Sequence, residues 1–310
     1  MIKYTFERIF YGIVTLFIIV SITFFLLKVL PGSPFNDEKL TDDQIKILNE
    51  KYGLNDPVVV QYGRYLSNIV TKFDFGKSFK YDNQDVLRNL VLPRLPRTIK
   101  VGSVALLIGI SVGMILGAIS ALNRGKFLDN FLTVIAVLGS SIPSFVFAMV
   151  LQYTLAVKIP IFPVLYDDKK SISIILPAIA LSVGIISTLT RFVRTELVEV
   201  LNSDFILLAK AKGLSKSQVI YRHAIRNALI PVITIIGPTV LSVLTGSVVM
   251  DTIFGIPGLG HLMVEAINVN DYFVVLTVAT FFSTLFIIIM LIIDLLYGII
   301  DPRIRITGGK

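Results

Sequence analysis

The 310-residue sequence contains no cysteine, only two histidines and few charged residues. Without cysteine the chain can form no disulfide, no thiolate nucleophile and no cysteine-ligated zinc site. The histidines, His223 and His261, lie far apart in the sequence and are a poor ligand set for a metal. Charged residues are 16% of the chain, whereas a soluble domain usually carries about 25%. The distribution of the apolar residues, which make up 54% of the chain, is therefore the main indication of the fold.

The apolar residues concentrate in six blocks that contain no charged residue. A helix rises about 1.5 Å per residue and needs about 20 residues to cross the hydrocarbon core of a bilayer. Six blocks of this length are not expected from the buried helices of a soluble protein. The sequence therefore predicts an all-α integral membrane protein with six transmembrane helices, at 9–27, 101–122, 131–157, 171–190, 227–250 and 272–293.

The positions of Lys and Arg predict how the chain crosses the membrane. With the N-terminus inside, the inner segments carry 14 of these residues and the short outer segments, 158–170 and 251–271, carry 3. The long segment after the first block exceeds about 60 residues, a length at which the positive-inside rule loses force. The first block follows Lys3 and Arg8 but has no small-residue cleavage site, so we expect a retained signal-anchor helix. Both termini are expected in the cytoplasm.

The outer segment between the first two blocks has the signals of short helices. Thr41 and Gln44 have the spacing of a capping box, and Gly53 is placed to end the helix that follows. Asp56 is then expected to cap a second helix, with Pro57 at its first position. A small helical segment on the outer face is the resulting prediction.

The inner segment 191–229 predicts a helix–glycine–helix hairpin. Ser203 or Asp204 can begin the first helix, and Gly213 can end it in a left-handed conformation. Ser215 and Gln218 repeat the capping-box spacing at the start of the second helix, which continues into the fifth block. Charge alone would fit an ordinary basic loop that obeys the topology rule.

The order of residues in this hairpin indicates more than its charge does. The stretch Asp-Phe-Ile-x-x-Ala-Lys-Ala-Lys-Gly-Leu-Ser (204–215) is followed by Arg-His-Ala-Ile-Arg-Asn-Ala-Leu-Ile-Pro (222–231). It resembles the coupling loop of binding-protein-dependent ABC importer permeases. Ala209 and Gly213 match that family's Glu-Ala-Ala-x3-Gly pattern, whereas Leu207 and Leu208 replace its Glu and first Ala. Pro231 matches a downstream proline at a longer spacing, and Ile230 precedes it where the pattern has leucine.

The departures from the general pattern fit the dipeptide/oligopeptide branch of that family. Stretches 24–34, 73–79, 253–260 and 297–303 also resemble this branch, so the resemblance spans the chain. It is closest to the B-type oligopeptide permease subunits.

This resemblance implies a type I-like ABC importer permease in a bacterial cytoplasmic membrane, multi-pass, moving oligopeptides by alternating access. It implies residues 1–30 as the first transmembrane helix, 31–98 as an extracytoplasmic helical segment, 99–300 as the permease core and 301–310 as a cytoplasmic tail. The implied partners are a C-type second permease subunit, two ATPase subunits, an extracytoplasmic peptide-binding protein, the peptide and membrane lipid, with no nucleic acid. ATP and Mg²⁺ would be bound by the ATPases. The chain itself has no Gly-x-x-x-x-Gly-Lys-Ser/Thr phosphate loop, and no catalytic, cofactor or metal site is expected.

Other functions stay open at this point. Dipeptide and nickel-chelate permeases share the same motifs. An ion-coupled carrier would need intramembrane acids or inverted repeats, and only Asp294 is available. Asp294 could line the pore, pair with a cation or mark a helix end.

Two groups of site residues follow from the resemblance. Asp251 and Glu265 flank the outer turn, where they could contact the binding protein or be solvated, and we favour solvation. Those expected to couple to an ATPase are Asp204, Ala209, Lys210, Ala211, Lys212, Gly213, Leu214, Ser215, Arg222, His223 and Arg226. Those expected at an outer gate or a binding-protein contact are Phe254, Gly255, Pro257, Gly258, Gly260 and Glu265.

Overall fold

The computed structural model describes residues 2–29, 35 and 41–300. The expected tail, 301–310, and most of the stretch 30–40 lie outside these residues. Regular structure in the described part is helical apart from an isolated bridge between Lys77 and Asp85, which confirms the all-α prediction. Five helices there are long and apolar enough to span a membrane, at Thr5–Val29, Leu95–Leu122, Ser171–Leu201, Pro231–Ile253 and Tyr272–Leu295.

The third predicted block is a sharply bent pair of helices. It divides into α5 (Phe127–Ser141), α6 (Ser144–Gln152) and η2 (Tyr153–Lys158), with a bend of 99° at the break. Pro143 disfavours helical backbone at the residue before it, and Ile142 is accordingly extended, with ψ 123°. Counted as one span, this pair brings the total to the predicted six. By contrast, α10 (Ile225–Ile253) continues through Pro231 and Pro238.

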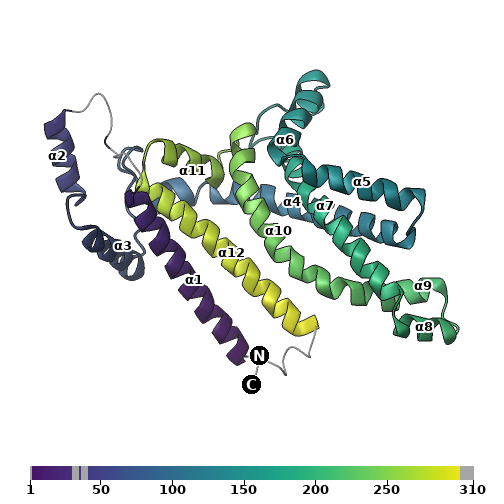
Figure 1. The fold of residues 1–310 in the computed structure, drawn as a ribbon. Helices are drawn as coiled ribbons and strands as arrows, with labels where there is room; N and C mark the ends of the chain where they lie inside the picture. The colour runs from purple at the N-terminus through teal and green to yellow at the C-terminus, as the bar shows by residue number, and fades with distance from the viewer. Residues whose placement is uncertain (1, 30–34, 36–40, 301–310) are drawn as a thin grey trace. The chain divides into compact units, whose positions relative to one another are not determined.

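The chain forms two compact parts, and the first contains 99–256 with the ends of the terminal helices. Its central helix is α7 (Ile175–Leu201), which continues past the predicted block end at residue 190. Helices α5, α6 and α10 all pack against α7. Figure 1 shows α7 between α5 and α10.

Glycines bring α4 (Leu95–Leu122) and α7 into close contact. Gly109, Gly113 and Gly117 recur every four residues along one face of α4. A Cβ added at Gly109 would lie 2.6 Å from the Cβ of Ile185, and one at Gly117 would lie 2.7 Å from the Cβ of Val193. Small residues at this spacing let two membrane helices approach closely, because lipid gives apolar side chains little reason to associate.

The second compact part contains 6–98 and 257–287. It holds most of α1 (Ile2–Val29), α2 (Asp42–Lys51), α3 (Val58–Lys72), η1 (Val86–Val91), α11 (Leu259–Asn268) and the first half of α12 (Tyr272–Ile300). Apolar side chains of α1, α3, η1, α11 and α12 share one core. Figure 1 shows α1 beside α12.

The helices predicted between the first two spans are present, with one local error. The capping box at Thr41 and Gln44 is present, and Gly53 has the left-handed φ of +63° expected at a helix end. However, Pro57 rather than Asp56 takes the N-cap position, so α3 begins one residue later than predicted. The Asp56 carboxylate instead accepts a hydrogen bond from Arg64 at 2.5 Å. A charged partner eight residues along the chain thus competes with the cap.

Asp271, just before α12, connects the segment between the first two spans to α12. Its carboxylate is fully buried and accepts hydrogen bonds from the Ser78 hydroxyl and from the backbone N–H of Phe79 at 3.0 Å. Burial raises the pKa of Asp271, and these hydrogen bonds oppose that shift. Sequence reasoning had no way to find this contact, since its partners are 193 residues apart.

The glycine contact predicts opposite effects for two Gly→Ala substitutions. An added Cβ at Gly113 would lie 2.8 Å from the Cβ of Leu189, whereas Gly184 on α7 has no atom within 4 Å. Gly113→Ala should therefore destabilise the protein by about 1–3 kcal/mol through overpacking. Gly184→Ala should stabilise it by about 0.5–1 kcal/mol through helix propensity. Thermal unfolding of the purified protein in detergent measures both, and equal shifts would rule out the close contact.

Candidate functional site

The predicted hairpin between the fourth and fifth spans is present. Helix α7 ends at Leu201, and α8 (Asp204–Ala211) follows after a short turn. A second turn leads to α9 (Lys216–Gln218) and η4 (Val219–Ala224), which continue directly into α10. Figure 1 shows α8 and α9 together at the end of α7. We call residues 202–224 the coupling hairpin.

Gly213 makes the sharp turn of the coupling hairpin, with φ +78°. The N–H of Gly213 donates to the Lys210 carbonyl at 3.0 Å, and that of Leu214 donates to the Ala209 carbonyl at 3.3 Å. These two bonds form a Schellman motif, which satisfies the last carbonyls of α8. An added Cβ at Gly213 would meet no atom within 4 Å, so it is the backbone conformation alone that favours glycine here.

The start of each hairpin helix is fixed differently. At α9 the predicted capping box is present, with Ser215 N–H to Gln218 at 2.9 Å and Gln218 N–H to the Ser215 hydroxyl at 3.3 Å. At α8 Ser203 occupies the N-cap position, but its hydroxyl donates back to the Val200 carbonyl at 2.6 Å and caps nothing. Of the two predicted caps, only the one at Ser215 acts through its side chain.

One face of the hairpin packs onto its own chain. Ile206, Ala209, Val219 and Ala224 are buried and share a core with Leu197 of α7. Ala209, matched by sequence to the family motif, therefore contacts this chain's own helices. The apolar packing holds the hairpin on the end of α7.

The opposite face is exposed and both apolar and basic. Leu207 is 67% exposed and Tyr221 is 71% exposed, and Phe205 and Leu208 are exposed as well. Sequence reasoning emphasised cations and small residues and overlooked these large side chains. Of the predicted coupling residues, Asp204, Lys210, Ala211, Lys212, Gly213, Ser215, Arg222 and Arg226 are exposed, Leu214 and His223 are half-buried, and Ala209 is buried.

A groove runs between the hairpin and the ends of α4 and α7. Apolar side chains line it, among them Leu122, Val198 and Leu214. Arg124, Lys210 and Lys216 also line it, so its charge is positive. A groove of this kind suits a partner that offers acidic groups beside apolar ones.

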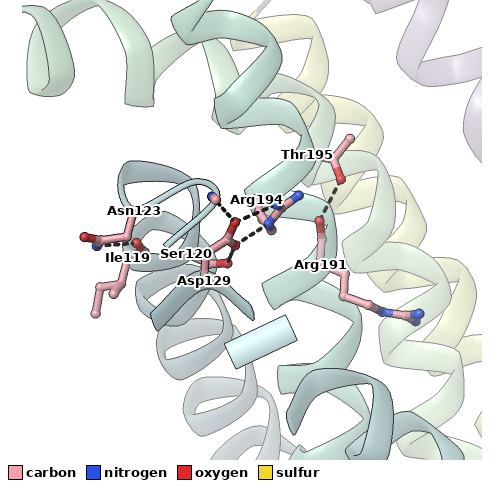
Figure 2. Close-up of polar contacts among 8 residues, drawn as sticks. Ile119, Ser120, Asn123, Asp129, Arg191, Arg194 and Thr195 are labelled. Carbon is pink, nitrogen blue, oxygen red and sulfur yellow. Dashed lines mark hydrogen bonds and ion pairs between the residues drawn. The ribbon is translucent and has the colours of Figure 1, made fainter. Parts of the chain in front are cut away.

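An ion pair between a buried carboxylate and a half-buried guanidinium lies beside the hairpin and was missed by sequence reasoning. The Asp129 carboxylate, 1% exposed, receives Arg194 Nε at 2.6 Å and Nη2 at 2.8 Å. The Ser120 hydroxyl at 2.5 Å and the Gly125 N–H at 2.9 Å complete its hydrogen bonds. Figure 2 shows the Arg194 side chain and the α4–α5 turn converging on this carboxylate.

The geometry of this pair is that of a strong, directional contact. Two parallel hydrogen bonds from one guanidinium fix its orientation as well as its distance. Removing Arg194 would leave the buried Asp129 carboxylate without its charged partner, which is strongly destabilising, whereas removing Asp129 would leave a guanidinium that water already reaches. In the sequence, Arg194 counts only toward topology and Asp129 lies two residues before an apolar block, so no pattern links them.

The residues expected at the outer turn divide between the two compact parts, and each is described within its own. Phe254 is buried at the C-cap of α10, and its carbonyl accepts from the Tyr166 N–H at 2.8 Å. Gly255 has φ +62° and is exposed. Asp251 is fully buried, so the expectation that it is solvated was wrong: the last turn of α10 packs inside this part.

In the other part, Gly258 takes the N-cap position of α11, and Pro257 is half-buried beside the buried Gly260. Glu265 on α11 is half-buried and accepts from the Tyr81 hydroxyl at 2.9 Å. Burial and this hydrogen bond raise the pKa of Tyr81 to about 12, so it stays a proton donor. Glu265 is therefore held within the chain as well as partly solvated.

Comparison with known proteins gives a consistent result. A family described as "Binding-protein-dependent transport system inner membrane component" matches residues 113–306, and its N-terminal counterpart matches 1–102. The chain is 44% identical to the dipeptide transport system permease protein DppB of Bacillus subtilis, over 99% of both chains. It is 40% identical to the oligopeptide transport system permease protein OppB of Haemophilus influenzae, over 98% of this chain and all of the relative.

Among solved structures, the MetNI methionine ABC transporter in inward-facing conformations is similar, with a TM-score of 0.59. The alignment covers 70% of this chain and 99% of that one at 19% identity, so it supports the fold alone.

The Ser215 capping box predicts a local stability effect. Ser215→Ala should lose one helix cap, a loss of about 0.5–2 kcal/mol. Ser217→Ala is the matched control, because Ser217 is exposed in the same short helix and caps nothing. Hydrogen exchange of the Gln218 and Val219 amides measures the difference, expected to be about two- to thirtyfold. Equal exchange in the two variants would contradict a working cap.

Proposed function

The chain belongs to the inner-membrane components of binding-protein-dependent transport systems, and from this premise we propose that it imports peptides delivered by an extracytoplasmic binding protein. As a member of this family it is a multi-pass integral membrane permease, not an enzyme, and it works without a cofactor of its own. The family membership also removes the reason to consider an ion-coupled carrier.

The coupling hairpin is the observation that carries the proposal. Its inner face is packed on α7, while its outer face presents exposed apolar and basic side chains. We propose that this outer face docks on one of two ATPase subunits. Movement of the ATPases would push the hairpin, and the permease would alternate between inward- and outward-facing states.

The proposed cargo is oligopeptides, in agreement with the OppB relatives of 38–40% identity. Dipeptides are the second candidate, because the DppB relatives are 41% and 44% identical. A nickel chelate is kept as a control cargo.

The remaining proposals concern orientation and partners. Both termini are proposed to be cytoplasmic, with 31–98 outside, 99–300 as the permease core and 301–310 as a cytoplasmic tail. A C-type second permease would complete the pore in a bacterial cytoplasmic membrane. The outer turn, residues 254–265, is proposed as a gate or binding-protein contact. Of the residues predicted for this role, Gly255 is the one that is exposed.

Gly213 offers a test of the coupling role. Gly213→Val should abolish peptide uptake and peptide-stimulated ATP hydrolysis, because a β-branched residue cannot easily adopt φ +78°. Gly213→Asn should retain most activity, since asparagine tolerates this conformation and no atom lies near the new side chain. Both variants should insert in the membrane. Uptake by the valine variant at the wild-type rate would exclude the coupling role.

Cargo can be determined directly. Uptake of labelled peptides of graded length, from two residues upward, should be measured in a strain that lacks the transporter and is complemented with it. Oligopeptide import predicts uptake that persists beyond two residues, whereas a dipeptide importer would stop there. Uptake of a nickel chelate alone would contradict both.

A further inference from the structure

We propose that the Asp129–Arg194 ion pair is the positioning device that makes the α4–α5 turn follow α7 when the coupling hairpin moves. This rests on the proposed function, in which an ATPase moves the hairpin. The pair touches neither cargo nor nucleotide. It would act by transmitting the displacement of α7 to the bent helix pair formed by α5 and α6.

The first step is the connection from hairpin to Arg194. Arg194 lies two turns before the end of α7, on the stretch that carries Leu197 and Leu201. Leu197 is buried against Ile206 and Ala209 of the hairpin. Because this contact is tightly packed, the hairpin and the end of α7 should move together.

The second step is the connection from Arg194 to the other helices. Asp129 is in the first turn of α5, Ser120 in the last turn of α4 and Gly125 in the turn between them. The Asp129 carboxylate therefore links the end of α4, the turn after it and the start of α5 to the Arg194 guanidinium. Figure 2 shows that no other labelled side chain enters this contact from α7, since Arg191 points elsewhere.

Apolar packing between the helices does not replace the ion pair. Along the membrane, α7 meets α4 through Gly109, Gly113 and Gly117, and Gly139 of α5 lies directly against Ser187. These contacts consist mainly of dispersion, which is weak for each atom pair and does not fix orientation, with one long hydrogen bond from the Thr190 hydroxyl to the Gly113 carbonyl at 3.4 Å. The bidentate pair fixes orientation and register where the helices leave the apolar region.

A double variant separates this positioning role from stability. Asp129→Leu with Arg194→Met removes both charges and keeps apolar volume, a change that commonly leaves a protein as stable as before. The permease should be purified with its partner subunits and reconstituted in proteoliposomes. Arg191→Met on the same helix is the control, because Arg191 is exposed and outside the pair.

Two readouts are compared in each background. The first is peptide taken up per ATP hydrolysed. The second is thiol labelling of Ser141→Cys, an exposed position at the α5–α6 break, with and without ATP; the chain has no other cysteine. In the double variant we expect assembly and hydrolysis within about twofold of wild type and at least a tenfold loss of uptake per ATP. We also expect loss of the ATP-dependent labelling change that Ser141→Cys should show when the ion pair is intact. The Arg191→Met background should behave as wild type.

Wild-type coupling together with a wild-type labelling change in the double variant would overturn the proposal. Loss of assembly or of thermal stability in the double variant would also overturn it, in favour of a purely structural role. Failure of the wild-type complex to take up peptide refutes the proposed cargo instead, since the labelling readout needs only ATP and still tests the pair.

Discussion

In hydrocarbon every backbone N–H and C=O must be satisfied within the protein, and the structure depends on this constraint. It makes each apolar block a helix, and it carries α10 through Pro231 and Pro238 without a break. Where a block does break, at Pro143, the two halves meet at 99°. A bend of this size at membrane depth is tolerated when it faces protein or water, which is the environment a permease offers.

Helices that share an apolar solvent need another reason to associate. On α4 that reason is the small size of three glycines four residues apart. They let α7 approach until its side chains contact the α4 backbone. At the end of the same interface the Asp129–Arg194 pair adds direction to the contact. Close packing on the glycines, a hydrogen bond from the Thr190 hydroxyl to the Gly113 carbonyl at 3.4 Å and the oriented ion pair at the end of the interface together hold α7 in place.

The coupling hairpin obeys the rules of a water-soluble element. Gly213 ends its first helix, a capping box begins its second, and apolar residues attach it to α7. Its exposed face retains Leu207 and Leu208 where the family pattern has Glu and Ala. Large apolar side chains left exposed on a polar segment are typical of a surface that another protein covers.

The sequence by itself determined the spans, the hairpin, the Thr41 and Ser215 caps and the turn at Gly213, because these depend on local composition and on neighbours within a few residues. It misplaced the start of α3 by one residue, where Arg64 draws Asp56 away from the cap. Only the tertiary structure decided that Asp251 is buried, that Asp271 holds Ser78 and that Asp129 meets Arg194. The last two contacts join residues 193 and 65 positions apart, and a polar residue carries no local mark of the distant partner that satisfies it.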